Sequence, residues 1–173
     1  MVGITQSLAS MGIANFDLLS VSSAGIMSNP TQPSVLVKTG ASDDCTGDGT
    51  TVTLTTDTEY WDTQGEWDGT STYTAEGDGY RLVIVTPPLL GVGSGHTDII
   101  ISALSSNRTQ GVRHAGDEFA KAGGFEDLRP GWPFVVYMDD NDTLTLTVRV
   151  LGGAKTCDLN DDGAGLISID MMH

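Results

Sequence analysis

Oxygen-bearing side chains alternate near the C-terminus at Asp158, Asn160 and Asp162, and Gly163 follows them. This spacing is the first half of a calcium-binding loop, in which carboxylate and amide oxygens bind a hard cation and a glycine permits the sharp turn. The twelfth position is Ile169 rather than glutamate, and the residues after Gly163 have the pattern of a strand. Asp158, Asn160 and Asp162 are therefore candidate calcium ligands, and the simpler alternative is an acidic hairpin loop.

A second acidic segment, residues 43–50, contains Asp43, Asp44 and Asp48 among glycines and threonines. Its composition is typical of a turn-rich loop, and it is open to the same two interpretations. Calcium could tie subunits together if the two acidic segments met at one pole or across a subunit boundary. We expect no other cofactor.

Catalytic motifs are not found in the sequence. The three histidines, His96, His114 and His173, share no spacing with a nucleophile or with each other, and no zinc, phosphate-loop or dinucleotide fingerprint occurs. Residues 91–95 are rich in glycine, but they precede a strand rather than the helix N-terminus that would hold phosphate. We expect that the chain is not an enzyme.

The tryptophans Trp61, Trp67 and Trp132 have two interpretations. Aromatic rings beside Asp and Asn can stack on sugars, and tryptophan in a β-sandwich also packs in cores and interfaces.

The two cysteines, Cys45 and Cys157, also have two interpretations. They are free thiols in a reducing compartment, or a bridge between their two segments if the particle matures outside the cell.

The net charge of −15 limits the range of partners. Binding to nucleic acid or to an anionic membrane requires a basic patch, which this composition disfavours. The acidity provides solubility, or it binds cations. The sequence has neither a basic secretory n-region nor a run of about 20 apolar residues, so we expect use without a cleaved signal or a membrane span.

Residues 1–33 differ from the rest because Asp17 is their only charged residue. An apolar arm of this kind must pack on its own domain, on sister copies or on a partner, and the alternative is a disordered tail. We expect an extended docking arm over residues 1–33. Its candidate contact residues are Ile4, Leu8, Met11, Ile13, Phe16, Leu18 and Leu19.

From residue 34 to residue 173 the chain has the pattern of one all-β head domain. Short β-branched runs at 35–37, 80–85, 99–104, 134–138, 143–150 and 166–171 are separated by acidic or glycine-rich segments, including 89–96 and the irregular stretch 105–133. Eight or nine strands of this kind predict an antiparallel two-sheet jelly-roll sandwich.

Strand 80–85 and the isoleucine run 99–101 are apolar on both faces, whereas one face of a sandwich sheet is expected to meet water. The second apolar face needs a cover, which we expect to be a neighbouring subunit; a loop or the arm is the alternative. The predicted interface residues are Tyr80, Val83, Val85 and Ile100.

The order of these motifs resembles the tumour-necrosis-factor-like jelly roll, in particular the globular heads of complement and their bacterial and viral relatives. The resemblance rests on residues 60–68, 73–76 and 79–83, and it extends through 99–107, 142–150 and 165–169. It covers roughly residues 34–172. It implies a compact homotrimer that binds or builds rather than catalyses.

Trimeric heads with a short, non-secreted N-terminal arm are similar to the decoration, or cement, proteins of bacteriophage capsids. The resemblance therefore implies a viral structural protein on the outer surface of the virion, assembled in the host cytoplasm. Its arm would dock on the major capsid protein. The alternative is a receptor- or carbohydrate-binding adhesin module with the same fold.

Overall fold

A computed structural model of the chain divides into two compact units, residues 1–32 and 33–173. The sequence analysis placed the boundary one residue later, between residues 33 and 34. The structure describes residues 20–21, 27–28, 32–40, 42–92, 95–107, 109–115, 125–128, 131–159 and 165–172.

In the first unit the described residues form two short antiparallel strands, β1 (Ser20–Val21) and β2 (Met27–Ser28). The predicted docking residues lie outside the described part of the chain, so the arm stays a prediction. They are Ile4, Leu8, Met11, Ile13, Phe16, Leu18 and Leu19.

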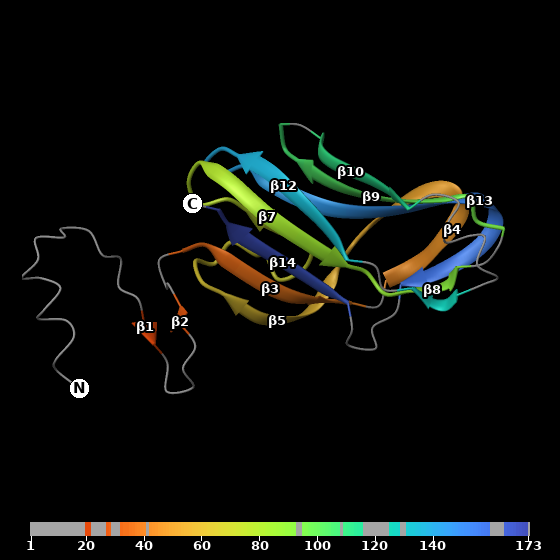
Figure 1. Ribbon diagram of the computed structural model, residues 1–173, viewed down its shortest axis with the longest axis horizontal. Helices are drawn as coiled ribbons and strands as arrows, with labels where there is room; N and C mark the ends of the chain where they lie inside the picture. The colour runs from red at the N-terminus through yellow and green to blue at the C-terminus, as the bar shows by residue number, and fades with distance from the viewer. Residues whose placement is uncertain are drawn as a thin grey trace, which may run out of the picture. The chain divides into compact units, whose positions relative to one another are not determined.

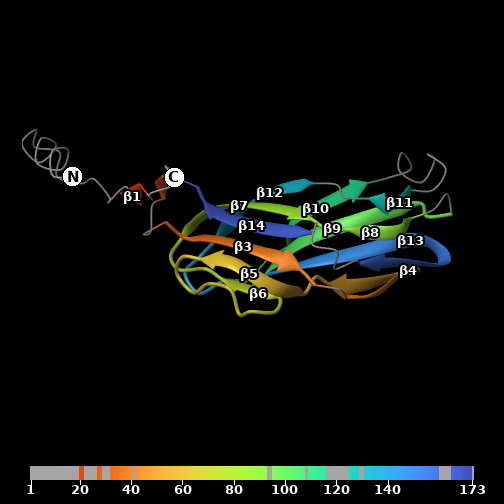
Figure 2. The same ribbon diagram turned by 90° about the horizontal axis from the view of Figure 1, so that it is seen from below.

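The second unit contains two antiparallel sheets, which Figures 1 and 2 show as the two layers of a sandwich. The five-stranded sheet has the order β12 (Trp132–Met138), β7 (Gly79–Thr86), β14 (Leu166–Met171), β3 (Ser34–Thr39) and β5 (Thr56–Asp62). The seven-stranded sheet has the path β10 (Thr109–Ala115), β9 (Asp98–Ser105), β13 (Thr143–Leu159), β8 (Leu89–Val92) and β11 (Phe125–Leu128). Two further strands, β4 (Ser42–Thr53) and β6 (Thr72–Thr74), also pair with β13.

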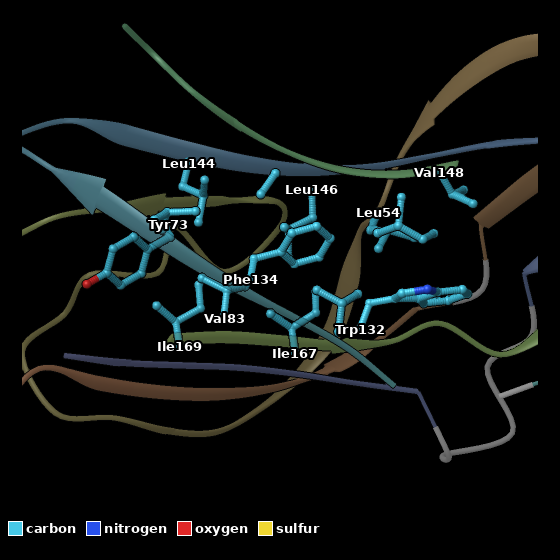
Figure 3. Close-up of a cluster of buried hydrophobic side chains, with 14 of the residues drawn as sticks. Leu54, Tyr73, Val83, Trp132, Phe134, Leu144, Leu146, Val148, Ile167 and Ile169 are labelled. Atoms are coloured by element: carbon cyan, nitrogen blue, oxygen red, sulfur yellow. The ribbon is translucent and has the colours of Figure 1, made fainter. Parts of the chain in front are cut away.

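The core lies between the two sheets because inward and outward residues alternate along each strand. In β14, Ile167 and Ile169 are buried, and in β13 Leu144, Leu146 and Val148 face them from the other sheet. Figure 3 shows these side chains packed against the aromatic rings of the core. Burial of each large aliphatic side chain stabilises the fold by roughly 1.5–3 kcal/mol. The predicted all-β antiparallel architecture is confirmed.

Three segments that we expected to be loops contain strands. The acidic segment 43–50 lies within β4, the glycine-rich segment 89–96 begins with β8, and the irregular stretch 105–133 contains β10 and β11. β4 and β8 pair with β13, and β11 pairs with β8, so pairing between distant segments outweighs local turn propensity for these three strands. β10 instead forms a hairpin with the preceding strand β9.

Strand β13 is longer than the alternating run 143–150 predicted, and it continues to Leu159. Its continuation requires a glycine at position 152, where φ is +119° and a Cβ atom would collide with the backbone of His96 and Thr97. The Thr97 amide donates a hydrogen bond to the Leu151 carbonyl at 2.8 Å, which fixes this close approach. Among the described residues, no helix is long and apolar enough to cross a membrane.

Candidate functional site

The outward face of the five-stranded sheet, meaning the face turned away from the core, is the candidate functional site. Side chains of strand β7 alternate between the core and this face. Arg81, Val83 and Val85 are buried, whereas Tyr80 and Ile84 are exposed. Val83 and Val85 are 0 % exposed within a single chain. The prediction that these two valines contact a neighbouring subunit is therefore wrong, because the core of their own sandwich already covers them.

Tyr80, by contrast, is 56 % exposed and lies on the outward face. Ile100, the fourth predicted interface residue, is half-buried in β9, where its register partners are His114 of β10 and Arg149 of β13. It belongs to the other sheet and does not adjoin Tyr80 in any strand pair. The four predicted interface residues therefore do not share one surface: they lie on both faces of β7 and on the other sheet.

An apolar patch covers the outward face of β12 and β7. The register aligns three cross-strand pairs, Tyr137 with Tyr80, Val135 with Leu82, and Pro133 with Ile84. Val135 is 56 % exposed and Ile84 is 38 % exposed. Apolar side chains gathered in this way on a soluble surface mark an interaction site more often than scattered ones do. We call these six residues the β12–β7 patch.

The two tyrosines of the β12–β7 patch contact each other edge to face, with ring centroids 5.2 Å apart and an interplanar angle of 71°. Desolvation and the nearby carboxylates of Asp139 and Asp78 raise the pKa of Tyr137. The Tyr137 phenol is therefore neutral at physiological pH. The two tyrosines offer a partner apolar ring surface and a hydroxyl group, a combination that is common in interfaces.

A polar strip crosses the middle of the outward face and separates the patch from β5. The Asp170 carboxylate accepts hydrogen bonds from the Ser34 hydroxyl at 2.7 Å and the Ser168 hydroxyl at 2.8 Å. The Trp61 indole donates to the Ser34 oxygen at 3.2 Å. Because both carboxylate oxygens already accept a hydrogen bond within the chain, the strip can be covered at a smaller desolvation cost.

The far side of the outward face carries Leu36 of β3 opposite Trp61 of β5, and Trp61 is 49 % exposed. An ion pair lies beside them, with the Lys38 ammonium 3.1 Å from the Asp57 carboxylate. The hydrogen bond from Lys38 is the main reason that the pKa of Asp57 lies below its usual value. The outward face thus carries the apolar β12–β7 patch at one side, a polar strip in the middle, and an exposed tryptophan beside an ion pair at the other side.

The tryptophans divide between the two interpretations left open above. Trp67 and Trp132 are buried, and Figure 3 shows Trp132 within the core cluster. Core packing therefore accounts for both of these rings. Trp61 is the tryptophan that a ligand could reach.

A buried polar cluster inside the sandwich escaped the sequence analysis. The Tyr73 hydroxyl donates to the Glu66 carboxylate at 2.5 Å and accepts from the Arg81 guanidinium at 2.9 Å. Arg81 also donates to the Gly77 carbonyl at 2.9 Å and to the Glu76 carbonyl at 3.2 Å. All three clustered side chains are almost fully buried, so they bond to one another inside the sandwich and not to solvent.

Burial governs the titration of this cluster. It raises the pKa of Glu66, although the hydrogen bond from Tyr73 and the charge of Arg81 oppose that shift. Burial and the hydrogen bond to Glu66 likewise raise the pKa of Tyr73. The available signal was an arginine in the inward-facing register of an apolar strand, because a buried arginine requires an acidic or carbonyl partner.

The candidate calcium ligands are only partly described. Asp158 lies in β13 with Leu90 of β8 as its register partner, whereas Asn160 and Asp162 fall outside the described residues. Backbone pairing brings the start of β4 beside the last residues of β13, with Ser42 opposite Leu159. In the described part of the chain, no three His, Cys, Asp or Glu side chains gather as a metal site would require. Calcium binding stays a prediction.

The histidines do not form a site in the described residues. His96 is buried near the start of β9, and His114 lies in β10, paired with Ile100. His173 lies outside the described residues.

Comparison with solved structures identifies the fold. Murine APRIL superposes with a TM-score of 0.52 at 11 % sequence identity, covering 82 % of this chain and all of that one. The TNF protein Eiger from S. frugiperda superposes with a TM-score of 0.53, also at 11 % identity, covering 82 % of this chain and 93 % of that one. No protein-family model and no curated protein matches the sequence.

These similarities support a TNF-like jelly roll, as the motif order predicted. At such low identity they show the fold alone. Function must therefore be argued from the outward face and from the composition of the chain.

Proposed function

We propose that the chain is a non-catalytic structural module that associates through the outward face of its five-stranded sheet. The observation that carries this proposal is the β12–β7 patch, where Tyr80, Ile84 and Val135 are exposed on a chain that is otherwise strongly acidic. A second copy of the chain is a suitable cover, because burying apolar side chains stabilises an assembly and the central polar strip is already hydrogen-bonded. The resemblance to the TNF-like jelly roll supports three copies.

The test measures mass in solution by light scattering. We expect a particle of three times the 18.2 kDa chain mass at micromolar concentration. Ile84→Asp places a charge in the β12–β7 patch, and we expect it to yield single chains that keep the β-sheet circular dichroism. Thr51→Asp adds the same charge at an exposed position of β4 and should leave the trimer intact. A wild-type chain that is monomeric, or an Ile84→Asp variant that stays assembled, contradicts the proposal.

We further propose that the assembled head decorates a bacteriophage capsid and that residues 1–33 dock on the major capsid protein. The apolar, nearly uncharged composition of that segment supports the docking role, because three linked arms bind together with high avidity even when each is weak. Deleting residues 1–30 should leave a trimeric head that no longer co-sediments with capsid shells. In the full chain, Phe16→Asp together with Leu18→Asp should have the same effect. A deleted head that still occupies shells fully would refute the docking role.

The alternative is a receptor- or carbohydrate-binding adhesin, and one observation favours it. Trp61 is half exposed on β5, at the edge of the five-stranded sheet, with its indole nitrogen already anchored to Ser34. A ring held in this way can stack on a sugar. Glycan-array binding that is lost in Trp61→Ala but kept in Tyr60→Ala, with no affinity for shells, would establish this alternative.

A further inference from the structure

The two cysteines are brought directly opposite each other by the fold. Cys45 in β4 and Cys157 in β13 are register partners in an antiparallel pair, although about 110 residues separate them in sequence. The neighbouring partners Thr46 and Thr156 continue the same register. Spacing in the sequence alone did not decide between free thiols and a bridge, whereas the register gives a specific geometric reason for a bridge.

Antiparallel register satisfies the distance requirement of a disulfide. Residues directly opposite each other in an antiparallel pair have Cα atoms about 4.5–5.5 Å apart and share one face of the sheet. Disulfides span Cα separations of roughly 4.4–6.8 Å. The register of residues 45 and 157 therefore meets the backbone distance that a disulfide requires.

The position of this pair also gives the bond a structural purpose. The β4–β13 ladder shifts register between Leu151 and Thr156, and again between Cys157 and Leu159. The cysteine pair thus lies in a short regular stretch between two irregularities, where register is weakly specified by backbone pairing. Figures 1 and 2 show β4, β13 and β8 together at the end of the head that is far from the C-terminal end of β14.

We propose that Cys45 and Cys157 form an intrachain disulfide that fixes the register of β4 on β13. The oxidant is a small-molecule disulfide such as oxidised glutathione. One cysteine thiolate attacks it, forms a mixed disulfide and releases one reduced glutathione. The second thiolate then attacks the protein sulfur of the mixed disulfide, closes the 45–157 bond and releases the second reduced glutathione.

The attacking species is the thiolate, so exchange is slow at neutral pH and faster above the ordinary thiol pKa of about 8.5. The chain stays reduced in a reducing compartment and becomes linked after it leaves one, and this does not depend on the proposed assembly or on capsid binding.

The experiment uses the full chain, equilibrated with oxidised glutathione at about pH 8.5 and compared with chain kept in reductant. We expect no titratable thiol in denaturant after oxidation, one linked peptide pair containing residues 45 and 157, and an unchanged chain mass on a non-reducing gel. The midpoint of thermal unfolding should be about 10 °C higher for the oxidised form, because the bond closes a loop of about 110 residues.

Cys45→Ser and Cys157→Ser serve as matched variants. Each should bind one glutathione as a mixed disulfide and unfold at the same temperature in oxidant and in reductant. Two free thiols after equilibration, a double mixed disulfide, or a bond between chains would overturn the proposal. Because each readout concerns a single chain, failure of the proposed assembly would leave this result unaffected.

Discussion

The two faces of strand β7 reverse the usual pattern of a sandwich strand. The inward face carries a charged residue, Arg81, beside Val83 and Val85, and the core seals all three. The outward face carries Tyr80 and Ile84, which remain exposed to solvent in the single chain. A charge is therefore inside and hydrophobic side chains are outside.

This reversal separates two kinds of stability. The buried arginine is tolerated because a carboxylate, a phenol and two backbone carbonyls surround it. Its contribution belongs to the folding of one chain and is independent of concentration. The exposed side chains contribute only when a partner covers them, so their effect depends on concentration. Substitutions on alternate residues of one strand can test this distinction.

The largest effect is expected on the inward face, from Arg81→Met. This change removes the positive charge near the buried Glu66 carboxylate, and an uncompensated buried charge typically costs about 3–5 kcal/mol. Denaturant unfolding at pH 7 measures the loss. If Arg81→Met unfolded with the same free energy as the wild type, the buried charge would not be needed for stability, and the contrast between the two faces would fail.

The pH dependence of this variant has a defined sign. Burial already raises the pKa of Glu66 above 4.5, and loss of Arg81 raises it further. The folded state then binds a proton more tightly than the unfolded state, so this group stabilises the fold most below pH 4.5 and less as pH rises through the raised pKa. Adding Glu66→Gln to Arg81→Met removes the charge, keeps a carbonyl acceptor for Tyr73 and should recover much of the lost stability.

A smaller effect is expected from the matched pair Val83→Ala and Ile84→Ala. Val83→Ala opens a cavity in the core and should lower the free energy of unfolding by about 2 kcal/mol at every protein concentration. Ile84→Ala should change the unfolding of the single chain by less than about 0.5 kcal/mol. It should instead weaken self-association, which sedimentation velocity over a dilution series measures.

The opposite result would exchange the roles of the two faces. If Val83→Ala weakened association and left unfolding unchanged, Val83 would have to lie in an interface. If Ile84→Ala destabilised a chain that is monomeric at every dilution, the outward face would be covered by the chain itself.

Sequence reasoning succeeded where the pattern is local. The run 143–150 predicted the first part of β13, and the run 166–171 matches β14. It also predicted that strand 80–85 is apolar on both faces. It did not assign the correct face to Val83 and Val85, because alternation shows which residues share a face and does not show which face is inside.

Features that arise from pairing between distant segments could not be predicted. The acidic residues of 43–50 favour turns locally, yet they form β4 because β13 pairs with them from far along the chain. The residues of the Glu66–Tyr73–Arg81 cluster are nearer in sequence, but the cluster forms only because the fold brings their side chains together inside the sandwich. A single sequence shows that Arg81 needs a partner and does not identify which acid supplies it.

The smallest effect is expected from Lys38→Met, which breaks the ion pair with Asp57. Lys38 and Asp57 lie on the outward side of the sheet, where solvent screens their attraction and such pairs contribute little. The midpoint of thermal unfolding should shift by about 1 °C or less, as measured by differential scanning calorimetry.

The sign of the pH effect is also the reverse of that for Glu66. Lys38 lowers the pKa of Asp57, so whatever the pair contributes is present above pH 3.8 and is lost as pH falls towards the lowered value. A loss from Lys38→Met as large as that from Arg81→Met would show that the outward face is buried in the protein as it exists in solution. If that loss of stability disappeared when the protein was diluted to single chains, the outward face would be covered by another copy of the chain.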